Sequence, residues 1–283
     1  MTDSVACIPP HLAAENRISV IPAANIIIGD KTYIEGVNLS AAEAYALIKK
    51  DPDNFVTSAI TPGLILDEYR KLSKETRNIL VITISSTLSA VFQSVELAAD
   101  TFREESPDTI IRITDSKTCA GAEGLIVLAV ARAAAQGMDI EQLIAMAGHL
   151  RQRTGGLMFL DTLRYIYRTG RMSKTASRIA SILNIKPINR VSDDGTVEFV
   201  DRVRKRSDGF KKLIELIKKD AASESLHFMV SHANAPEIAQ TFCEQLKGEF
   251  NCLSLIISDY SPVMGYGAGP GGLFVGFQSE PDL

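Results

Sequence analysis

The 283-residue sequence lacks the common signatures of metal, redox and hydrolytic chemistry. Its four cysteines lie far apart and form no C-x-x-C pair, which excludes a zinc ribbon and a dithiol redox motif. Its four histidines include neither H-x-x-H nor H-E-x-x-H, and no carboxylates have the spacing of metal ligands. No G-x-S-x-G nucleophile motif occurs either. We therefore expect no metal ion and no hydrolase site.

The sequence also lacks a loop for the phosphates of ATP, because no G-x-x-x-x-G-K-[ST] occurs. Gly267, Gly269 and Gly272 formally satisfy the dinucleotide pattern G-x-G-x-x-G. Pro270 interrupts this segment, however, and a strand pattern follows it where a dinucleotide site needs a helix. We interpret residues 265–272 as a loop whose backbone can approach a ligand closely, with a structural turn as the alternative.

Long hydrophobic runs and an excess of basic charge are missing as well. The most apolar helical segment, residues 124–135, contains Arg132 and is shorter than the ~20 residues of a membrane span. No basic region precedes an apolar stretch at the N-terminus, so we expect a cytoplasmic protein without a secretory signal or stable membrane insertion. Thirty Lys and Arg against 34 Asp and Glu give a net charge of −4, which disfavours a surface that binds nucleic acid throughout.

The first half of the sequence predicts an α/β domain with a mainly parallel sheet. Short apolar runs predict strands, and amphipathic stretches between them predict helices. The expected strands are residues 18–28, 78–85 and 109–114. One expected helix starts at Ser40, and three others cover residues 62–76, 87–99 and 121–136. This alternation is typical of parallel sheets. We place this N-terminal domain at residues 1–150.

The second half predicts a C-terminal α/β domain with a mixed sheet, at residues 151–283. The expected strands are residues 155–161, 185–191, 196–202, 226–232, 252–257 and 273–277, with two basic helical patterns between 162 and 183 and helices at 208–219 and 236–248. The sequence S-D-D-G at residues 192–195 predicts a hairpin turn, because Asp and Gly tolerate positive φ angles.

Hydroxyl side chains follow two of the apolar segments. Ser85 and Ser86 end one predicted strand, and Thr57 with Ser58 ends the segment F-V-T-S. Ligands of open α/β sheets bind beyond the carboxyl ends of the strands, where helix-start amides and hydroxyls suit an anionic group. The alternative is that these residues cap helices, and both roles can coexist.

Eleven short segments, taken in order, are more specific than any one of them. They are T-D-S (2–4) followed by I-P-P-H-L, V-I-P (20–22), T-S-x-x-x-P (57–62), I-S-S-T-L-S-A-V-F-Q-S-V (84–95), D-S-K-T (115–118), F-L-D-T-L (159–163), T-G-R-M-S-K (169–174), L-N-I-K-P-I (183–188), V-R-K-R (203–206) and G-P-G (269–271). This ordered set resembles the DegV family of bacterial fatty-acid-binding proteins, which includes the acyl-binding subunits of fatty acid kinase. The resemblance runs nearly end to end.

The resemblance implies two α/β domains, a small insertion near residues 23–50 in the first, and a long-chain fatty acid bound between the domains. It also implies that the carboxylate of the fatty acid is held by Thr57 and by Ser85 or Ser86. The spacing of the motif does not decide which serine binds.

The sequence departs from the family at one implied ligand contact. The family has a histidine two residues before G-P-G, and this chain has Gly267 there. The Tyr266 hydroxyl, or backbone amides of the glycine segment including Gly267 and Ala268, are the expected replacements. Otherwise the site prefers another lipid or binds weakly.

The resemblance further implies a lipid-binding protein that is not an enzyme and needs no cofactor. A separate ATP-dependent fatty acid kinase would phosphorylate the carboxylate that this chain presents, in agreement with the missing ATP loop. Arginines after the hairpin strand, Arg202, Arg204 or Arg206, would pass the ligand to the kinase, with a solvated basic face as the alternative. Arg171 is a weaker candidate, whose alternative role is to bridge the domains.

The sequence is also compatible with two other functions. One is an enzyme that acts on a small anionic ligand at the same hydroxyl residues, although no recognisable base accompanies them. The other is nucleic-acid binding through R-V-R-K-R at residues 202–206, which the acidic balance of the chain disfavours.

Overall fold

The computed structural model describes residues 1–172 and 185–280, and one of its sheets is fully parallel. This sheet has the strand order β2-β1-β6-β7, and each neighbouring pair is parallel. Its strands are β1 (Thr2–Asp3), β2 (Val20–Ile21), β6 (Asn78–Thr83) and β7 (Ile110–Asp115). The predicted parallel sheet in the N-terminal part is therefore confirmed.

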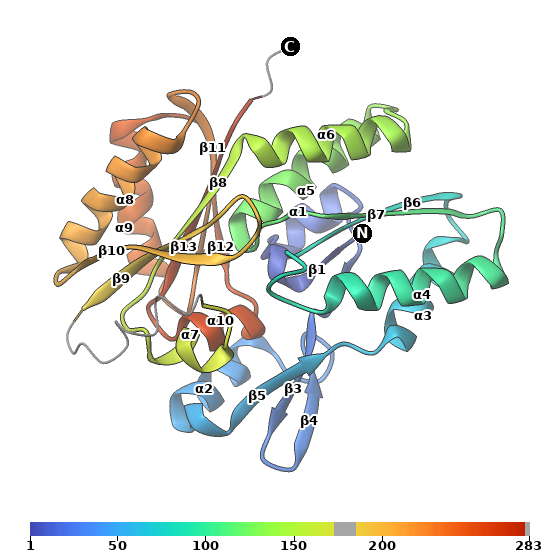
Figure 1. The fold of residues 1–283 in the computed structure, drawn as a ribbon, viewed down its shortest axis with the longest axis horizontal. Helices are drawn as coiled ribbons and strands as arrows, with labels where there is room; N and C mark the ends of the chain where they lie inside the picture. The colour runs from blue at the N-terminus through green and yellow to red at the C-terminus, as the bar shows by residue number, and fades with distance from the viewer. Residues whose placement is uncertain (173–184, 281–283) are drawn as a thin grey trace.

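A six-stranded mixed sheet forms the C-terminal part (Figure 1). Its order is β10-β9-β8-β13-β11-β12, in which β11 and β12 are parallel and the other neighbours antiparallel. Its strands are β8 (Thr154–Phe159), β9 (Lys186–Val191), β10 (Val197–Val203), β11 (Ser225–His232), β12 (Asn251–Asp259) and β13 (Leu273–Ser279). The mixed α/β class is confirmed. We keep the boundary near residue 150 as a proposal, which the start of this sheet at Thr154 supports.

A third, antiparallel sheet lies below the other two in Figure 1. It contains β3 (Ala24–Ile28), β4 (Lys31–Ile34) and β5 (Phe55–Ala59), with α2 (Ala41–Lys50) between β4 and β5 in the chain. The prediction of one strand over residues 18–28 is wrong, because β2 and β3 belong to different sheets. Pro22 lies between them and has no N–H to continue a ladder. We keep the insertion near residues 23–50 as a proposal, which this sheet supports, although its strand β5 ends only at Ala59.

The helices agree with the predicted pattern in most places. They are α1 (Pro10–Glu15), α2, α3 (Pro62–Leu72), α4 (Val91–Glu105), α5 (Ala120–Ala135), α6 (Ile140–Gln152), α7 (Arg164–Thr169), α8 (Arg206–Asp220), α9 (Pro236–Glu249) and α10 (Pro262–Ala268), with short 3-10 turns η1 (Ser4–Ala6) and η2 (Pro52–Asn54). The second helical pattern expected before residue 183 falls largely on residues 173–184, outside the described residues. Every helix in the described ranges is too short or too polar to cross a membrane.

Two segments differ clearly from the predicted helical pattern. Helix α4 begins at Val91, four residues after the expected start, because residues 86–90 form a turn. The segment 265–272, expected as a loop, is helical up to Ala268. Ser261 caps this helix by accepting a hydrogen bond from Met264 N at 3.4 Å, and Pro262 occupies its first turn, where a proline is tolerated.

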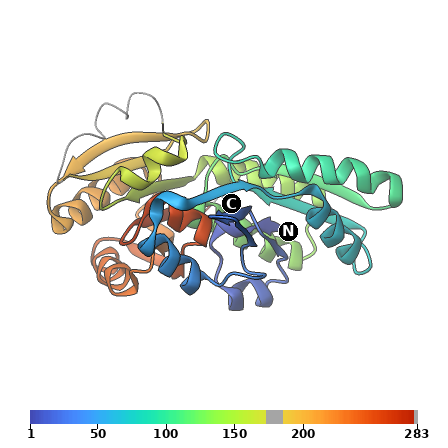
Figure 2. The same ribbon diagram turned by 90° about the horizontal axis from the view of Figure 1, so that it is seen from below.

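Helix α5 joins the two parts of the molecule through glycine contacts. A Cβ atom built on Gly276 of β13 would lie 2.4 Å from the backbone nitrogen of Ala122, and one on Gly121 would lie 2.4 Å from the carbonyl oxygen of Met229. Only hydrogen fits at these positions. The backbones of α5, β11 and β13 therefore pack in direct contact. Figure 1 shows α5 beside these strands, and Figure 2 shows the same ribbon from below.

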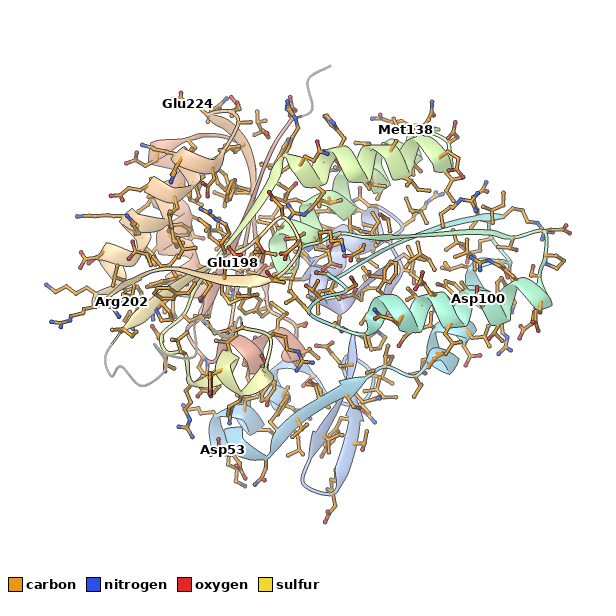
Figure 3. The ribbon with its side chains drawn as sticks, in the orientation of Figure 1. Asp53, Asp100, Met138, Glu198, Arg202 and Glu224 are labelled. Atoms are coloured by element: carbon orange, nitrogen blue, oxygen red, sulfur yellow. The ribbon has the colours of Figure 1, made fainter. Side chains whose placement is uncertain are left out.

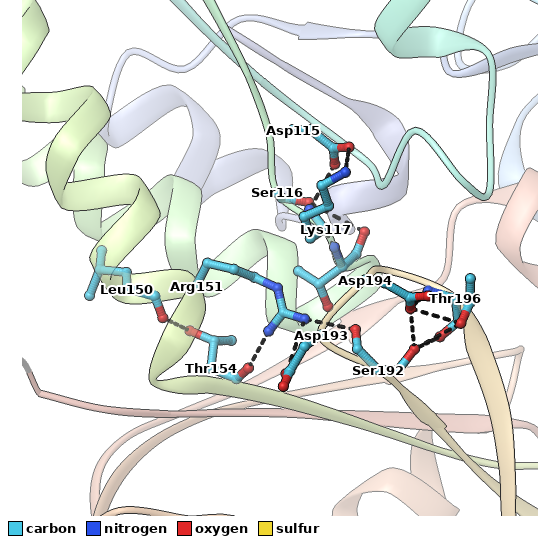
Figure 4. Close-up of polar contacts among 11 residues, drawn as sticks. Asp115, Ser116, Lys117, Leu150, Arg151, Thr154, Ser192, Asp193, Asp194 and Thr196 are labelled. Carbon is cyan, nitrogen blue, oxygen red and sulfur yellow. Dashed lines mark hydrogen bonds and ion pairs between the residues drawn. The ribbon is translucent and has the colours of Figure 1, made fainter.

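The predicted hairpin turn between β9 and β10 is confirmed, and it packs against the N-terminal part (Figure 4). Arg151 Nη2 donates to Ser192 O at 2.9 Å, and Thr87 Oγ1 donates to Gly195 O at 2.7 Å. Gly195 has a φ of +87°, and a Cβ there would lie 2.1 Å from Ser85 Oγ. The turn therefore needs glycine both for its backbone conformation and for its contact with Ser85.

Candidate functional site

A cavity of about 150 Å³ lies where the three sheets meet. Its wall combines residues of β5, the segment after β6, α7, β8, β10 and α10. Most of its lining is apolar, including Val5, Ile84, Met158, Val197 and Met264. Such a wall suits a hydrocarbon group better than a polar substrate.

Hydroxyl and charged groups also line this cavity. They belong to Thr57, Ser58, Ser89, Thr169, Tyr266 and Arg171. Thr57 and Ser58 come from β5, so they lie in the antiparallel sheet and not at the end of a parallel strand as predicted. Hydroxyl donors near an apolar wall suit a molecule with one polar end and one hydrocarbon end.

Ser89 is a cavity residue that the sequence reasoning missed. Its Oγ accepts a hydrogen bond from Val91 N at 3.4 Å, which leaves the hydroxyl proton available to a ligand. Ser89 and Ala90 immediately precede α4, whose free N-terminal amides and helix dipole favour a negative charge. A later start of α4, placed after L-S-A, would have revealed this serine.

The side chains of Ser85 and Ser86 are engaged outside the cavity lining. Ser85 Oγ lies 2.9 Å from Thr87 Oγ1, beside the hairpin turn. Ser86 bonds Asp115 through its backbone N–H, at 3.1 Å, and through its hydroxyl. Burial raises the pKa of Asp115, but hydrogen bonds from Ser86 and Lys117 outweigh it and hold this pKa below its ordinary value. The S-S segment thus contacts the hairpin and β7.

The end of α10 brings Tyr266, Gly267 and Ala268 into the cavity wall. The ring of Tyr266 stacks on Phe55 with 5.0 Å between the ring centroids, which fixes its position. A Cβ built on Gly267 would meet only Thr169 Cγ2, at an ordinary 3.6 Å. Space for a side chain therefore exists at Gly267.

The four arginine candidates have different surroundings. Arg206 donates to both carboxylate oxygens of Asp161 at 2.7 Å and to Gly271 O at 3.1 Å, so it supports the turn after α10. Arg202 and Arg204 are exposed, and Figure 3 shows Arg202 at the outer edge of the molecule. Arg171 reaches the cavity, where its Nε donates to Leu88 O at 3.2 Å.

The cavity contains one thiol, that of Cys119. Burial raises the pKa of Cys119 far above its usual range, with smaller contributions from Glu123 and Asp3. The thiol therefore stays protonated at neutral pH, and it lacks the thiolate character of a nucleophile.

Comparisons with known proteins give consistent matches along the whole chain. A family model described as an uncharacterised protein of the DegV family matches residues 1–280. A DegV domain-containing protein of Caldanaerobacter subterraneus is 29% identical over 99% of this chain and 98% of its own length. A DegV family protein from Eubacterium eligens loaded with heptadecanoic acid has a TM-score of 0.87 at 20% identity, over 99% of this chain and 98% of its own. The Streptococcus pneumoniae fatty acid kinase B3 protein loaded with linoleic acid has a TM-score of 0.86 at 20% identity, over 99% and 98% of the two chains.

Proposed function

Because this chain belongs to the DegV family, we propose that it binds a long-chain fatty acid in the cavity between β5, α7 and α10. The observation that carries the proposal is the composition of the cavity wall, in which an apolar lining accompanies hydroxyl groups and the N-terminus of α4. The fatty acids in the crystal structures from E. eligens and S. pneumoniae support the same ligand class.

In this proposal, Thr57 and Ser89 donate hydrogen bonds to the carboxylate of the ligand. Desolvating a carboxylate costs several kcal/mol unless donors replace water. A hydrogen bond to a charged group contributes roughly 1.5–3 kcal/mol, so two donors offset most of this cost. The positive end of the α4 dipole and the guanidinium of Arg171 add attraction for the negative charge.

The acyl chain needs more room than the cavity of about 150 Å³ provides. A cavity of that size holds a molecule about as large as benzene. Met158, Met264 and Leu88 line the cavity, and their flexible side chains can change rotamer to admit the chain. About 14 buried methylenes contribute on the order of 11 kcal/mol before ordering losses, which favours such a rearrangement.

We further propose that the protein presents the carboxylate to a separate ATP-dependent fatty acid kinase and is itself the non-catalytic subunit. The S. pneumoniae neighbour is a fatty acid kinase B3 protein, which supports this role. The exposed Arg202 and Arg204 are the candidates for contact with the kinase, whereas Arg206 is engaged by Asp161. The lack of an ATP motif in the sequence agrees with this division of labour.

Denaturing extraction of the purified protein tests the proposed ligand. We expect mass spectrometry of the extract to find long-chain fatty acid at near one molecule per chain, because the buried hydrocarbon dissociates slowly in water. The same extraction from a variant with Thr57→Val and Ser89→Ala is the control, and it should release much less. Lipid-free protein from fatty-acid-fed cells, which then binds no added fatty acid, would contradict the proposal.

Replacing Gly267 with His should raise fatty-acid affinity about tenfold. The position has a negative φ and an open space beside Thr169, so an imidazole can enter the cavity and donate one more hydrogen bond to the carboxylate. Gly267→Ala is the matched control, since it adds a Cβ without a donor and should leave affinity unchanged. Calorimetric titration with oleate measures both variants. Equal affinities for the His and Ala variants would place the carboxylate elsewhere.

A further inference from the structure

The carboxyl group of Asp3 lies directly behind the cavity wall. Asp3 is completely buried, and it belongs to the T-D-S segment for which the proposed function gives no role. Its Oδ1 accepts a hydrogen bond from Val5 N at 3.0 Å, and its Oδ2 accepts one from Ile84 N at 2.8 Å. Val5 and Ile84 both line the cavity. A single side chain therefore holds two separate segments of the wall.

A second buried carboxyl group, that of Glu35, holds other segments of the same wall. Its Oε1 accepts a hydrogen bond from the backbone N–H of Val263 at 3.2 Å, and its Oε2 accepts one from Ser4 Oγ. Ser4 Oγ in turn accepts a hydrogen bond from Ala23 N at 3.1 Å. Val263 and Ala23 are also cavity residues. Glu35 thus links the insertion to α10 across the wall.

We propose that Asp3 and Glu35 are positioning residues that hold the cavity wall in its ligand-binding shape when they are ionised. The inference rests on the proposed fatty-acid site. It follows from the hydrogen bonds, because each carboxylate accepts from two donors and at least one of these donors belongs to a wall segment. Hydrogen bonds to an ionised acceptor are shorter and stronger than those to a neutral one. A proton on Asp3 turns one oxygen into a hydroxyl group and removes the negative charge, which weakens the hydrogen bonds from the two wall amides.

The surroundings of these two groups set the pH range of the effect. Besides burial, the charge of Glu35 raises the pKa of Asp3, and the charge of Asp3 raises the pKa of Glu123 and of Cys119. Glu35 also adds to the effect of burial in raising the pKa of Cys7 and of Tyr45. Burial raises the pKa of Asp3 to about 7, against the hydrogen bonds from Ile84 and Val5. Burial likewise raises the pKa of Glu35. The wall therefore loses an ionised acceptor as the pH falls through 7.

Affinity and stability should consequently change with pH in opposite directions. Ligand affinity should rise from pH 6 to pH 8, as Asp3 becomes ionised and fixes the wall. Stability behaves differently, because the folded chain holds the Asp3 proton more tightly than the unfolded chain does. The contribution of Asp3 to stability is present below its unfolded pKa and is lost as the pH rises through about 7. A residue with a merely structural role would not produce this opposition.

The test is a titration with 11-(dansylamino)undecanoic acid, a fluorescent fatty acid, at pH values from 6 to 8, beside melting curves. We expect the wild type to bind about fivefold more tightly at pH 8 than at pH 6, because most Asp3 carboxyl groups change from neutral to ionised over this range. Asp3→Asn should bind as weakly at pH 8 as the wild type does at pH 6, with a smaller dependence on pH because only Glu35 remains to titrate. Glu35→Gln should also weaken binding at pH 8. This variant provides the test of the inference if Asp3→Asn fails to fold.

Glu123→Gln is the matched control. Glu123 is also completely buried, but its Oε1 accepts from Thr2 Oγ1 at 3.3 Å and its Oε2 has no partner, so it holds no cavity residue. This variant should keep the pH profile of binding. Tight binding by the wild type without any dependence on pH would overturn this inference but not the proposed function. An unchanged pH dependence of binding in Asp3→Asn would do the same. Wild-type protein that binds the probe at no pH would overturn the proposed function and this inference with it.

Discussion

Changing Thr57 to Val and Ser89 to Ala together should lower fatty-acid affinity by about a hundredfold or more. Each hydroxyl offers one hydrogen bond to the ligand carboxylate, worth roughly 1.5–3 kcal/mol, so their joint loss costs about 3–6 kcal/mol if the contributions add. The cavity remains apolar and keeps its shape, because Val replaces Thr with nearly the same volume. Calorimetric titration with oleate measures the loss, and melting curves should stay within a few degrees of the wild type.

Ser86→Ala is the matched control for this double variant. Its hydroxyl bonds Asp115 and lies outside the cavity lining, so affinity should stay within about twofold of wild type. The opposite pattern, with full binding by the double variant and weak binding by Ser86→Ala, would indicate that the S-S segment at residues 85–86 binds the ligand carboxylate. The titration thus decides between Ser86 and Ser89.

The substitution Gly276→Ala should destabilise the whole protein by about 3 kcal/mol or more. The added Cβ would lie 2.4 Å from the Ala122 nitrogen and 2.4 Å from the Gly121 carbonyl carbon, which are backbone atoms of α5. Overpacking costs typically 1–3 kcal/mol where side chains can adjust, and here the helix itself must move. We expect calorimetry to show a melting temperature lower by roughly 6–12 °C.

Gly148→Ala tests whether any added methyl group has this effect. Gly148 lies within α6, its φ is not positive, and no atom comes within 4 Å of a Cβ built there. Alanine is favoured over glycine in a helix by about 1 kcal/mol, so this variant should melt at or slightly above the wild-type temperature. Similar melting temperatures for Gly276→Ala and the wild type would mean that α5 and β13 are not in close contact.

Much of the fold could be predicted from the sequence because periodic apolar patterns are local signals. The strands on both sides of the S-D-D-G turn and the capping box at Ser40 need only a few neighbouring residues. Residues 18–28 were wrongly predicted as one strand, because the pairing of their two halves with different sheets depends on tertiary contacts. The helix at residues 262–268 was also missed, because its glycines oppose helix formation locally while packing against Tyr45 favours it.

The candidate site could be predicted only in part. Thr57 and Tyr266 do line the cavity, but Thr57 belongs to an antiparallel sheet rather than to the expected parallel one. Ser89 was missed because the start of α4 was placed four residues too early. The link between Asp3 and Ile84 joins residues 81 positions apart, and no local pattern encodes such a contact.

The position of β13 in the middle of the six-stranded sheet constrains how the protein is made in the cell. This strand pairs with β8 and β11, yet it follows both of them in the chain. During translation, β8 and β11 leave the ribosome without the neighbour that joins them, and the lining residue Ala268 emerges just before β13. The six-stranded sheet is therefore completed only after β13 has been synthesised, and nascent chains need protection of their exposed strand edges until then.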